Sequence, residues 1–217
     1  MSGVAYDYME QYIRGLIPQS EGILKELECF AQENSVPIIQ KEVGKFLELM
    51  INIKKPAKIL ELGTAIGYSA ILMQQSSENS EIVTIERDAN MVSIATENIK
   101  KYGFDKNIKV IEGDCLEVLE ELQEEFDLIF MDAGKGHYNH FLPHCLRLLK
   151  KDGIIIADNV LFKGMVASRE LLKRRKITIV KRMKTYLEMI SDNEELITSV
   201  IPMGDGIAVT ARRNKNE

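Results

Sequence analysis

The chain has 217 residues, of which 45% are hydrophobic and 28% are charged, and its formal net charge is −5. This length suits one α/β domain and is too short for two full-sized ones, and no apolar run approaches the roughly 18 residues that a membrane span needs. The three cysteines are far apart and form no CxxC pair, which argues against a zinc–cysteine site. Together with an N-terminus that lacks the pattern of a signal peptide, they lead us to expect a cytoplasmic protein.

The charge is unevenly distributed along the chain. Residues 163–184, called the basic segment below, carry a charge of +8 because Glu170 is the one acid among nine basic residues, while the rest of the chain carries −13. The nine are Lys163, Arg169, Lys173, Arg174, Arg175, Lys176, Lys181, Arg182 and Lys184. Such a patch on an acidic protein favours an anionic partner, with a solvated amphipathic helix as the alternative.

The first fifty residues have the apolar spacing of helices. Residues 6–34 follow this pattern with a break between Pro18 and Gly22, and a further helix is expected near residues 41–53. We therefore expect one domain over residues 1–217, made of an N-terminal helical cap (1–53) and an α/β core (54–217).

Short apolar runs alternate with amphipathic segments in the remainder of the chain. The runs are "KILEL" (58–62), "IVTIE" (82–86), "IKVIE" (108–112), "DLIFM" (127–131) and "GIIIA" (153–157). This alternation predicts a parallel sheet with helices on both faces. The segments "LITSVIP" and "GDGIAVTAR" predict an antiparallel hairpin at the sheet edge. Residues 176–180, "KITIV", have a strand-like composition, but a helical pattern follows them, so their structure stays open.

A glycine loop, "ILELGTAIGYSA" (59–70), follows the first predicted strand and begins a helix. It lacks the G-x-G-x-x-G pattern of dinucleotide-binding proteins, and Glu61 before Gly63 would repel a pyrophosphate but attract a cationic ligand. Glu86 ends the second predicted strand, where an acid commonly binds a ribose diol, and "EGD" (112–114) follows the third. These strand ends line the ligand crevice of such sheets, although each acid alone could be an ordinary surface residue.

Oxygen-bearing side chains follow the fourth and fifth predicted strands. Asp132 comes after the fourth, and Asp158 and Asn159 come after the fifth. If the strands are neighbours, two carboxylates and an amide converge, and a divalent cation would relieve the repulsion between the carboxylates. Oxygen ligands favour Mg²⁺, Mn²⁺ or Ca²⁺ over zinc. The alternative is that Asp158 caps a turn and Asn159 bonds to backbone.

Two further features lie beside Asp132. Lys135 would sit over the cation, whose charge would lower the lysine pKa toward that of a general base, with a solvated loop lysine as the alternative. His137, His140 and His144 have a spacing that permits zinc binding on one helix face, but no fourth ligand is evident. We expect them to be partly exposed helix histidines.

Taken together, these motifs resemble the class I S-adenosylmethionine-dependent, metal-dependent O-methyltransferases of the catechol and caffeoyl-CoA type. "ELGTAIGYSA", "TIERD", "MDAGKGHY", "ADNV" and "MGDGIAV" match motifs of that family, and the resemblance covers nearly the whole chain. It implies a Rossmann-like fold, with a seven-stranded, mostly parallel sheet between helices and an antiparallel C-terminal hairpin. A homodimer is expected because such enzymes are often dimers.

The resemblance implies S-adenosylmethionine as the cofactor and assigns parts of it to individual residues. Glu86 would hold the ribose hydroxyls, and Gly113, Asp114 and Cys115 would border the adenine. The methionine part and the remaining contacts would involve Ile38, Glu61, Gly63, Tyr68, Ser69 and Asp132.

The resemblance also implies catalytic and metal-binding roles. Asp132, Asp158 and Asn159 would bind Mg²⁺, and Lys135 and Asp132 would be the catalytic residues. Gly134 stands where plant coenzyme-A-type enzymes carry an acid, and the chain has no tryptophan to flank a catechol pocket. Both departures argue against a simple catechol or caffeoyl-CoA substrate.

Among bacterial members, the chain looks most similar to tRNA 5-hydroxyuridine methyltransferases. The family mechanism needs two vicinal oxygens, and in 5-hydroxyuridine O5 and O4 are vicinal, as in catechol. The expected reaction therefore gives 5-methoxyuridine at the wobble position of tRNA. The RNA would bind Lys173, Arg174, Arg175, Lys176 and Arg182 of the basic segment.

Other functions stay open at this point. The same chemistry on a small catechol-like or caffeoyl-CoA-like substrate is the main alternative. A catalytically silent cofactor-binding or RNA-binding protein would not need the Asp132, Asp158 and Asn159 set. An NAD-dependent dehydrogenase is disfavoured because the third glycine of its fingerprint is missing.

Overall fold

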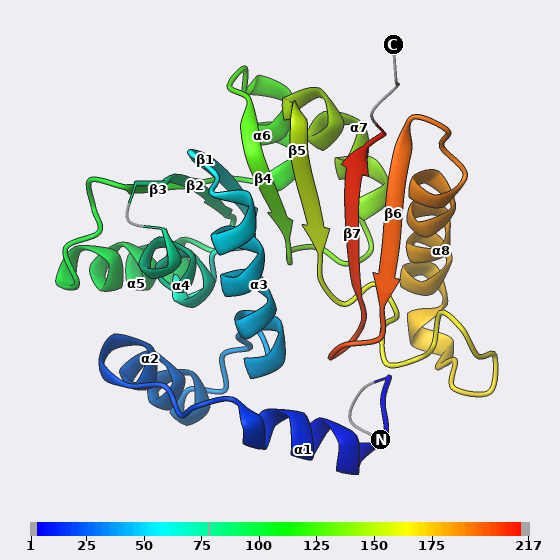
Figure 1. Cartoon of the computed structure of the whole chain (residues 1–217), viewed down its shortest axis with the longest axis horizontal. Coiled ribbons are helices and arrows are strands. Elements are labelled where there is room, and N and C mark those ends of the chain that lie inside the picture. The colour runs from blue at the N-terminus through cyan, green and yellow to red at the C-terminus, as the bar shows by residue number, and fades with distance from the viewer. Residues whose placement is uncertain (1–3, 78, 214–217) are drawn as a thin grey trace.

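The chain forms a seven-stranded sheet between two layers of helices in the computed structural model, which describes residues 4–77 and 79–213 (Figure 1). The strand order is β3-β2-β1-β4-β5-β7-β6. The strands are β1 (Lys58–Leu62), β2 (Glu81–Glu86), β3 (Ile108–Glu112), β4 (Phe126–Met131), β5 (Leu149–Ala157), β6 (Leu196–Ile201) and β7 (Ile207–Arg212). β1 to β5 pair in parallel, whereas β7 runs antiparallel to both β5 and β6. The predicted fold, including the C-terminal hairpin, is confirmed.

The helices connect the strands in the expected alternation. They are α1 (Asp7–Leu16), α2 (Gly22–Glu33), α3 (Lys41–Lys54), α4 (Tyr68–Ser76), α5 (Ala89–Lys101), α6 (Cys115–Glu121), α7 (Tyr138–Leu148) and α8 (Ile177–Ser191). Residues 176–180 belong to helical structure: the 3₁₀ turn η1 (Arg174–Lys176) leads directly into α8. Helical packing overrides the strand-like composition there because Val180, Met183, Tyr186 and Ile190 form one buried face.

Successive residues of the central strands alternate between two hydrophobic cores. In β1, Ile59 packs with α2, α3 and α4, whereas Leu60 packs with α6, α7 and α8 on the other face. In β4, Phe130 packs in the same core as Ile59, and Ile129 packs in the same core as Leu60. Because both faces are covered, these strands are apolar almost throughout, as expected for a buried parallel sheet.

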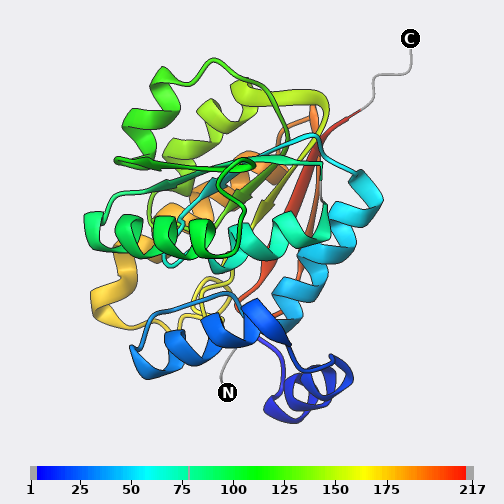
Figure 2. The ribbon, with the colours of Figure 1, turned by 90° about the vertical axis from the view of Figure 1, so that its left-hand side faces the viewer.

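The N-terminal helices lie beyond the carboxyl ends of the parallel strands. In Figure 1 the arrowheads of β4 and β5 point toward the end of the molecule that carries α1 and α2, and Figure 2 places both helices at that same end. The segment between α2 and α3 therefore covers the strand ends, and its residues Pro37 and Ile38 line a cavity there.

Several large apolar side chains of α1 are exposed to solvent. Tyr8, Tyr12 and Leu16 are 67–70% exposed. The expected homodimer stays a prediction. No helix of the described chain is long and apolar enough to cross a membrane.

Candidate active site

Two adjoining cavities lie at the carboxyl ends of the parallel strands. The central cavity, about 390 Å³, is bordered by the loops after β1, β4 and β5. The side cavity, about 370 Å³, lies toward β2 and β3. Glu86 and Ala133 line both cavities. This is the crevice in which open α/β sheets bind their ligands.

The predicted metal residues converge in the central cavity. β4 and β5 are neighbours with Met131 opposite Ala157, so Asp132 and Asp158 follow at the same level. Asp158 and Asn159 are only 2% and 7% exposed, and both line the cavity with Asp132. Asn159 has a φ of 62°, an unusual conformation for a residue with a side chain and one that recurs at functional sites. The structure thus brings together all three residues that the sequence selected.

The electrostatics of these two carboxylates fit a bound cation. Burial raises the pKa of Asp132 to about 7, and the charge of Lys135 opposes this shift. Burial, followed by repulsion from Asp132, likewise raises the pKa of Asp158 to about 7. A divalent cation would offset both the desolvation and the repulsion, and two carboxylates with an amide form a hard donor set that suits Mg²⁺.

Two alternatives to a magnesium site were left open by the sequence, a turn-capping role for Asp158 and a zinc site at the histidines. Asp158 Oδ1 accepts a 2.6 Å hydrogen bond from the backbone N–H of Asn159, so the turn-capping role left open by the sequence is also present. Within residues 4–77 and 79–213, no group of three or more His, Cys, Asp or Glu could hold a metal. This finding does not bear on the Asp132, Asp158 and Asn159 set, which contains only two such residues. It does bear on the three histidines, so the zinc alternative is unsupported. His137 and His140 are exposed, and His144 is half-buried.

Tyr138 is a residue of this site that the sequence did not indicate. Its hydroxyl donates to the carbonyl oxygen of Met131 at 2.8 Å and lies 3.1 Å from that of Asp158. Tyr138 is fully buried at the start of α7. It therefore ties together the ends of β4 and β5, which carry the metal residues.

The glycine loop approaches the loop after β4 very closely. Gly63 has a φ of 104°, and a Cβ placed on it would lie 2.9 Å from the Cβ of Ala133. Only glycine fits such a contact at this φ. Gly67, with a φ of 84°, is the N-cap residue directly before α4. This loop lines the central cavity next to the metal residues.

Glu61 is completely buried beneath the glycine loop. Its Oε2 accepts a 2.6 Å hydrogen bond from the hydroxyl of Thr84, while its Oε1 has no partner among the described residues. Burial raises its pKa to about 7. A buried acid with an unpaired oxygen is suited to receive a cationic donor.

The side cavity is lined by Glu86, Asp114 and Cys115, three of the four residues predicted for the ribose and adenine, but not by Gly113. Glu86 accepts hydrogen bonds from three backbone N–H groups: Oε2 from Ala65 at 3.0 Å, and Oε1 from Arg87 at 2.9 Å and Asp88 at 3.0 Å. Gly113 donates its N–H to the carbonyl of Glu86 at 2.9 Å. A carboxylate has about four acceptor positions, so one position, on Oε2, stays available for a ligand hydroxyl.

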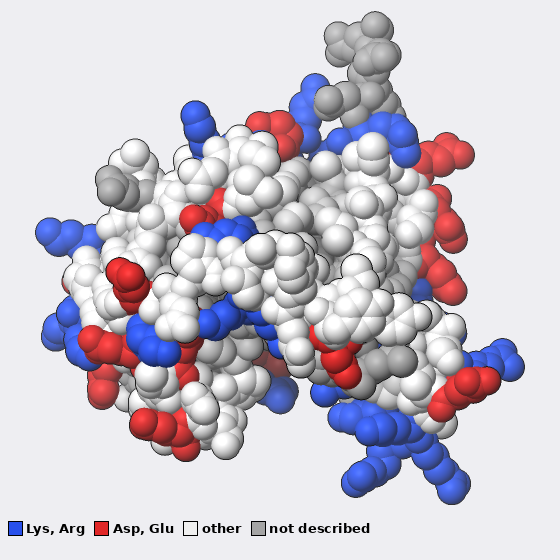
Figure 3. Space-filling view, turned by 60° about the horizontal axis from the view of Figure 1, so that its bottom comes forward, with Lys and Arg blue, Asp and Glu red and all other residues white. Residues whose placement is uncertain are grey.

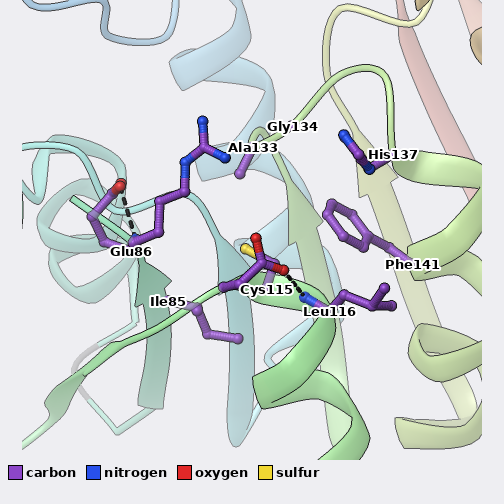
Figure 4. Close-up of a pocket in the computed structure, with 10 residues that line it drawn as sticks. Ile85, Glu86, Cys115, Leu116, Ala133, Gly134, His137 and Phe141 are labelled. Carbon is purple, nitrogen blue, oxygen red and sulfur yellow. Dashed lines mark hydrogen bonds between the residues drawn. The ribbon is translucent and has the colours of Figure 1, made fainter.

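The wall opposite Glu86 is aromatic (Figure 4). His137 and Phe141 stack there with ring centroids 6.2 Å apart. Asp114 and Cys115 complete the lining, and Asp114 caps α6 by accepting from the N–H of Leu116 at 2.9 Å. This flat wall suits a planar ring and was not foreseen, because it depends on the orientation of α7.

Four of the residues predicted to contact the cofactor line neither cavity: Glu61, Tyr68, Ser69 and Gly113. The hydroxyl of Tyr68 donates to Glu28 Oε1 at 3.0 Å, so it connects α4 to α2, and its side chain lines neither cavity. Ser69 is 7% exposed in the first turn of α4 and also lines neither. Ile38, in contrast, lines the central cavity as expected.

The basic segment borders the central cavity at two points. Lys163 lines the cavity, and Arg182 donates to the carbonyl of Gly136, next to Lys135, at 3.2 Å. Eight of its nine basic residues are exposed, and Arg182 is half-buried. None of the nine forms an ion pair with another described residue. Figure 3 shows a dense group of Lys and Arg side chains at the lower right, around η1.

Comparisons with known proteins agree with this arrangement. The family model "O-methyltransferase" matches residues 17–213. A catechol O-methyltransferase from Niastella koreensis is 32% identical, over 76% of this chain and 78% of its own. A caffeoyl-CoA O-methyltransferase from Populus kitakamiensis is 29% identical, over 82% and 78%.

Solved structures give the same answer. The S-adenosylhomocysteine-bound methyltransferase from Podospora anserina is 25% identical, covers 96% of this chain and 95% of its own, and superposes with a TM-score of 0.87. The family match spans most of the chain, including the glycine loop, the metal residues and the C-terminal hairpin. The chain therefore belongs to the O-methyltransferase family.

Proposed function

We propose that this enzyme transfers a methyl group from S-adenosylmethionine to a hydroxyl that lies next to a second oxygen on the acceptor, with a divalent cation at Asp132, Asp158 and Asn159. The observation that carries this proposal is the pair of carboxylates, Asp132 half-buried and Asp158 buried, which shares a cavity with the glycine loop at Gly63. Methyl donor and acceptor can therefore meet in one cavity. Transfer is fast when the two reacting groups are held in line.

Different residues would bind the methionine, ribose and adenine parts of the cofactor. Glu61 lies completely buried beneath the glycine loop and would attract the ammonium of the methionine part through its charge. Glu86 would accept from the ribose hydroxyls, and the wall formed by His137 and Phe141 suits the adenine ring.

The acceptor would bind over the carboxylate pair. A cation bound there would lower the pKa of the acceptor hydroxyl. Lys135 lines the same cavity, and in its neutral amine form, which a neighbouring cation would favour, it would take up the hydroxyl proton. Tyr138 would keep Asp132 and Asp158 at a fixed separation through its contacts with the ends of β4 and β5.

The names of the relatives favour a small acceptor. Catechol and the caffeoyl group carry two neighbouring phenolic oxygens, and the two curated relatives described above are named for them. We therefore infer that a small compound with vicinal oxygens is one candidate acceptor for this chain.

The basic segment favours a second candidate, a tRNA carrying 5-hydroxyuridine, whose product would be 5-methoxyuridine. Its side chains are exposed and without acidic partners in the described chain, so their charge is free to bind phosphates. Lys163 and Arg182 connect this surface to the active site. A small-molecule enzyme has no need of such a surface there.

Three measurements test the proposal. Purified enzyme with S-adenosylmethionine should methylate catechol or tRNA in Mg²⁺ and lose that activity in EDTA. Asp132→Ala and Asp158→Ala should abolish transfer while S-adenosylmethionine binding, measured by calorimetry, falls less. Full activity in EDTA would contradict the metal-dependent reaction.

Nucleoside mass spectrometry of tRNA from cells with and without the protein separates the two acceptors. Loss of 5-methoxyuridine with accumulation of 5-hydroxyuridine would identify tRNA as the acceptor. An unchanged nucleoside profile, together with turnover of a vicinal diphenol, would identify the small acceptor.

A further inference from the structure

The loop between β6 and β7 places Asp205 beside the metal residues. The backbone N–H of Leu161 donates to the carbonyl of Asp205, and that of Val160 donates to the carbonyl of Gly206, both at 2.9 Å. Gly206 has a φ of 91° and packs against Leu161, where a Cβ would lie only 2.4 Å from Cγ. The loop is therefore fastened to the segment that directly follows Asn159.

The carboxylate of Asp205 receives no hydrogen bond from the residues that the structure describes. Asp205 is 7% exposed and lines the central cavity, and its Oδ1 is buried without a partner in residues 4–77 and 79–213. The charges of Lys135 and Lys163 act on it, but neither lysine forms an ion pair with it. A buried carboxylate left in this state costs free energy, and a donor on the ligand would recover it.

Asp205 does not form a three-acid metal site with Asp132 and Asp158 among the described residues. If Asp132, Asp158 and Asp205 surrounded one position, they would form a group of three acids that could hold a metal, and the described residues contain no such group. Asp205 shares the cavity with the carboxylate pair and acts electrostatically on Asp158, so its carboxylate is available to a part of the acceptor close to the chelating oxygens.

The lining of the central cavity is polar. Apart from Pro37, Ile38 and Ile39, it consists of charged, amide and small residues, and none of the lining residues of this described cavity is aromatic. A phenyl ring gains most from apolar and aromatic walls. A ring with its own hydrogen-bond donors and acceptors fits this lining better.

Resting on the proposed function, we propose that Asp205 determines acceptor specificity by accepting a hydrogen bond from a ring N–H adjacent to the chelating oxygen pair. The acceptor is then a 5-hydroxypyrimidine, in which N3–H stands next to O4, and not a diphenol, which has C–H at that position. A site built to bind an N–H discriminates strongly against an analogue that lacks it, because the buried acceptor is left unpaired.

The test compares three acceptors in Mg²⁺ and S-adenosylmethionine: an anticodon stem-loop with 5-hydroxyuridine, the same stem-loop with N3-methyl-5-hydroxyuridine, and catechol. The enzymes are the wild type, Asp205→Ala, Asp205→Asn and the control Asp105→Ala, which removes an exposed acid outside both cavities. kcat and KM are measured separately, and anisotropy gives stem-loop affinity with S-adenosylhomocysteine bound. Thermal melting checks that each variant folds.

The wild type should prefer the N–H acceptor over its N3-methyl analogue by about ten- to hundredfold in kcat/KM, as expected for a hydrogen bond to a charged group. Asp205→Ala should abolish this preference, mainly through KM and stem-loop affinity. Asp205→Asn should restore part of it through its carbonyl oxygen, and Asp105→Ala should match the wild type.

The remaining outcomes separate the two proposals. If Asp205→Ala keeps the wild-type preference for the N–H acceptor, or lowers turnover of both stem-loops equally, Asp205 does not accept a hydrogen bond from the ring N–H. Turnover of catechol without turnover of either stem-loop overturns the inference but leaves the proposed function standing. If the wild type methylates none of the three acceptors, the proposed function itself fails.

Discussion

The hydroxyl of Tyr138 donates a 2.8 Å hydrogen bond to the carbonyl oxygen of Met131, the last residue of β4. The same hydroxyl lies 3.1 Å from the carbonyl oxygen of Asp158, just beyond β5. One buried phenol thus contacts the ends of both strands that precede the predicted metal residues. This relationship makes the separation of Asp132 and Asp158 depend on α7, which begins at Tyr138.

Tyr138→Phe should lower the free energy of unfolding by about 1–3 kcal/mol, because buried carbonyl groups lose their donor. It should also weaken Mn²⁺ binding, since the strand ends are no longer held together. Tyr186→Phe is the matched control: Tyr186 packs edge-on against Tyr138, is also fully buried, and its hydroxyl has no partner in the described chain. Urea denaturation should show no loss for the control. Equal losses for both variants would contradict this role of the Tyr138 hydroxyl.

Gly63→Ala should weaken S-adenosylhomocysteine binding and destabilise the fold. The new Cβ would meet Ala133, whose neighbour Asp132 lies in the site. Gly103→Ala is the control, because Gly103 also has a positive φ, 77°, but a Cβ there meets no atom within 4 Å. The control should cost only the backbone strain, about 1–2 kcal/mol, and should leave calorimetric binding of the cofactor product unchanged.

Glu61 should make the stability of the cofactor-free protein fall as pH rises. Burial raises its pKa from 4.5 to about 7, so between these values the folded state keeps a proton that the unfolded state has released. This contribution to stability is present below pH 4.5, decreases up to about pH 7 and is constant above it, a change of roughly 3 kcal/mol. Urea denaturation between pH 5 and 8 should show a shallower slope for Glu61→Gln, in which this group does not titrate. An identical slope would contradict the assignment.

Metal affinity should also depend on pH, but it should rise with pH, whereas the stability contribution of Glu61 falls. Without a cation, burial raises the pKa of both Asp132 and Asp158 to about 7, so below pH 7 the cation must displace protons. Mn²⁺ binding should therefore weaken by up to about tenfold per pH unit for each proton released as pH falls from 7 to 5. Calorimetry in buffers of different ionisation enthalpy measures the protons directly. Asp152→Asn, an exposed acid paired with Lys54, should not alter this profile.

The sequence predicted the sheet well because its strands are buried on both faces. Runs such as residues 58–62 and 127–131 are apolar nearly throughout, and strand-end residues of a parallel sheet meet at one edge. Asp132, Asp158 and Asn159 could therefore be grouped before their geometry was known. The pattern did not decide residues 176–180, since β-branched residues favour a strand locally while the buried face of α8 is formed by residues further along.

The residues that the sequence missed depend on packing between distant segments. Asp205 reaches the cavity because β7 pairs antiparallel with β5, with Ala208 opposite Ala157, and no local pattern reports that register. Phe141 faces the side cavity because of the orientation of α7. In the same way, Tyr68 was expected at the cofactor but turns toward Glu28, a partner that only the packing of α2 provides.

Reversing charge in the basic segment separates the two candidate acceptors. Lys173, Arg174 and Arg175 are exposed and unpaired in the described chain, so changing all three to Glu should weaken tRNA binding and flatten its salt dependence. The control reverses Lys100, Lys106 and Lys109, which are exposed near β3, at the opposite edge of the sheet from β6. Filter binding across a salt series should show a loss for the first triple variant that clearly exceeds that of the control. Equal effects would mean that the basic segment is an ordinary solvated surface, and the small vicinal-oxygen acceptor would then be favoured.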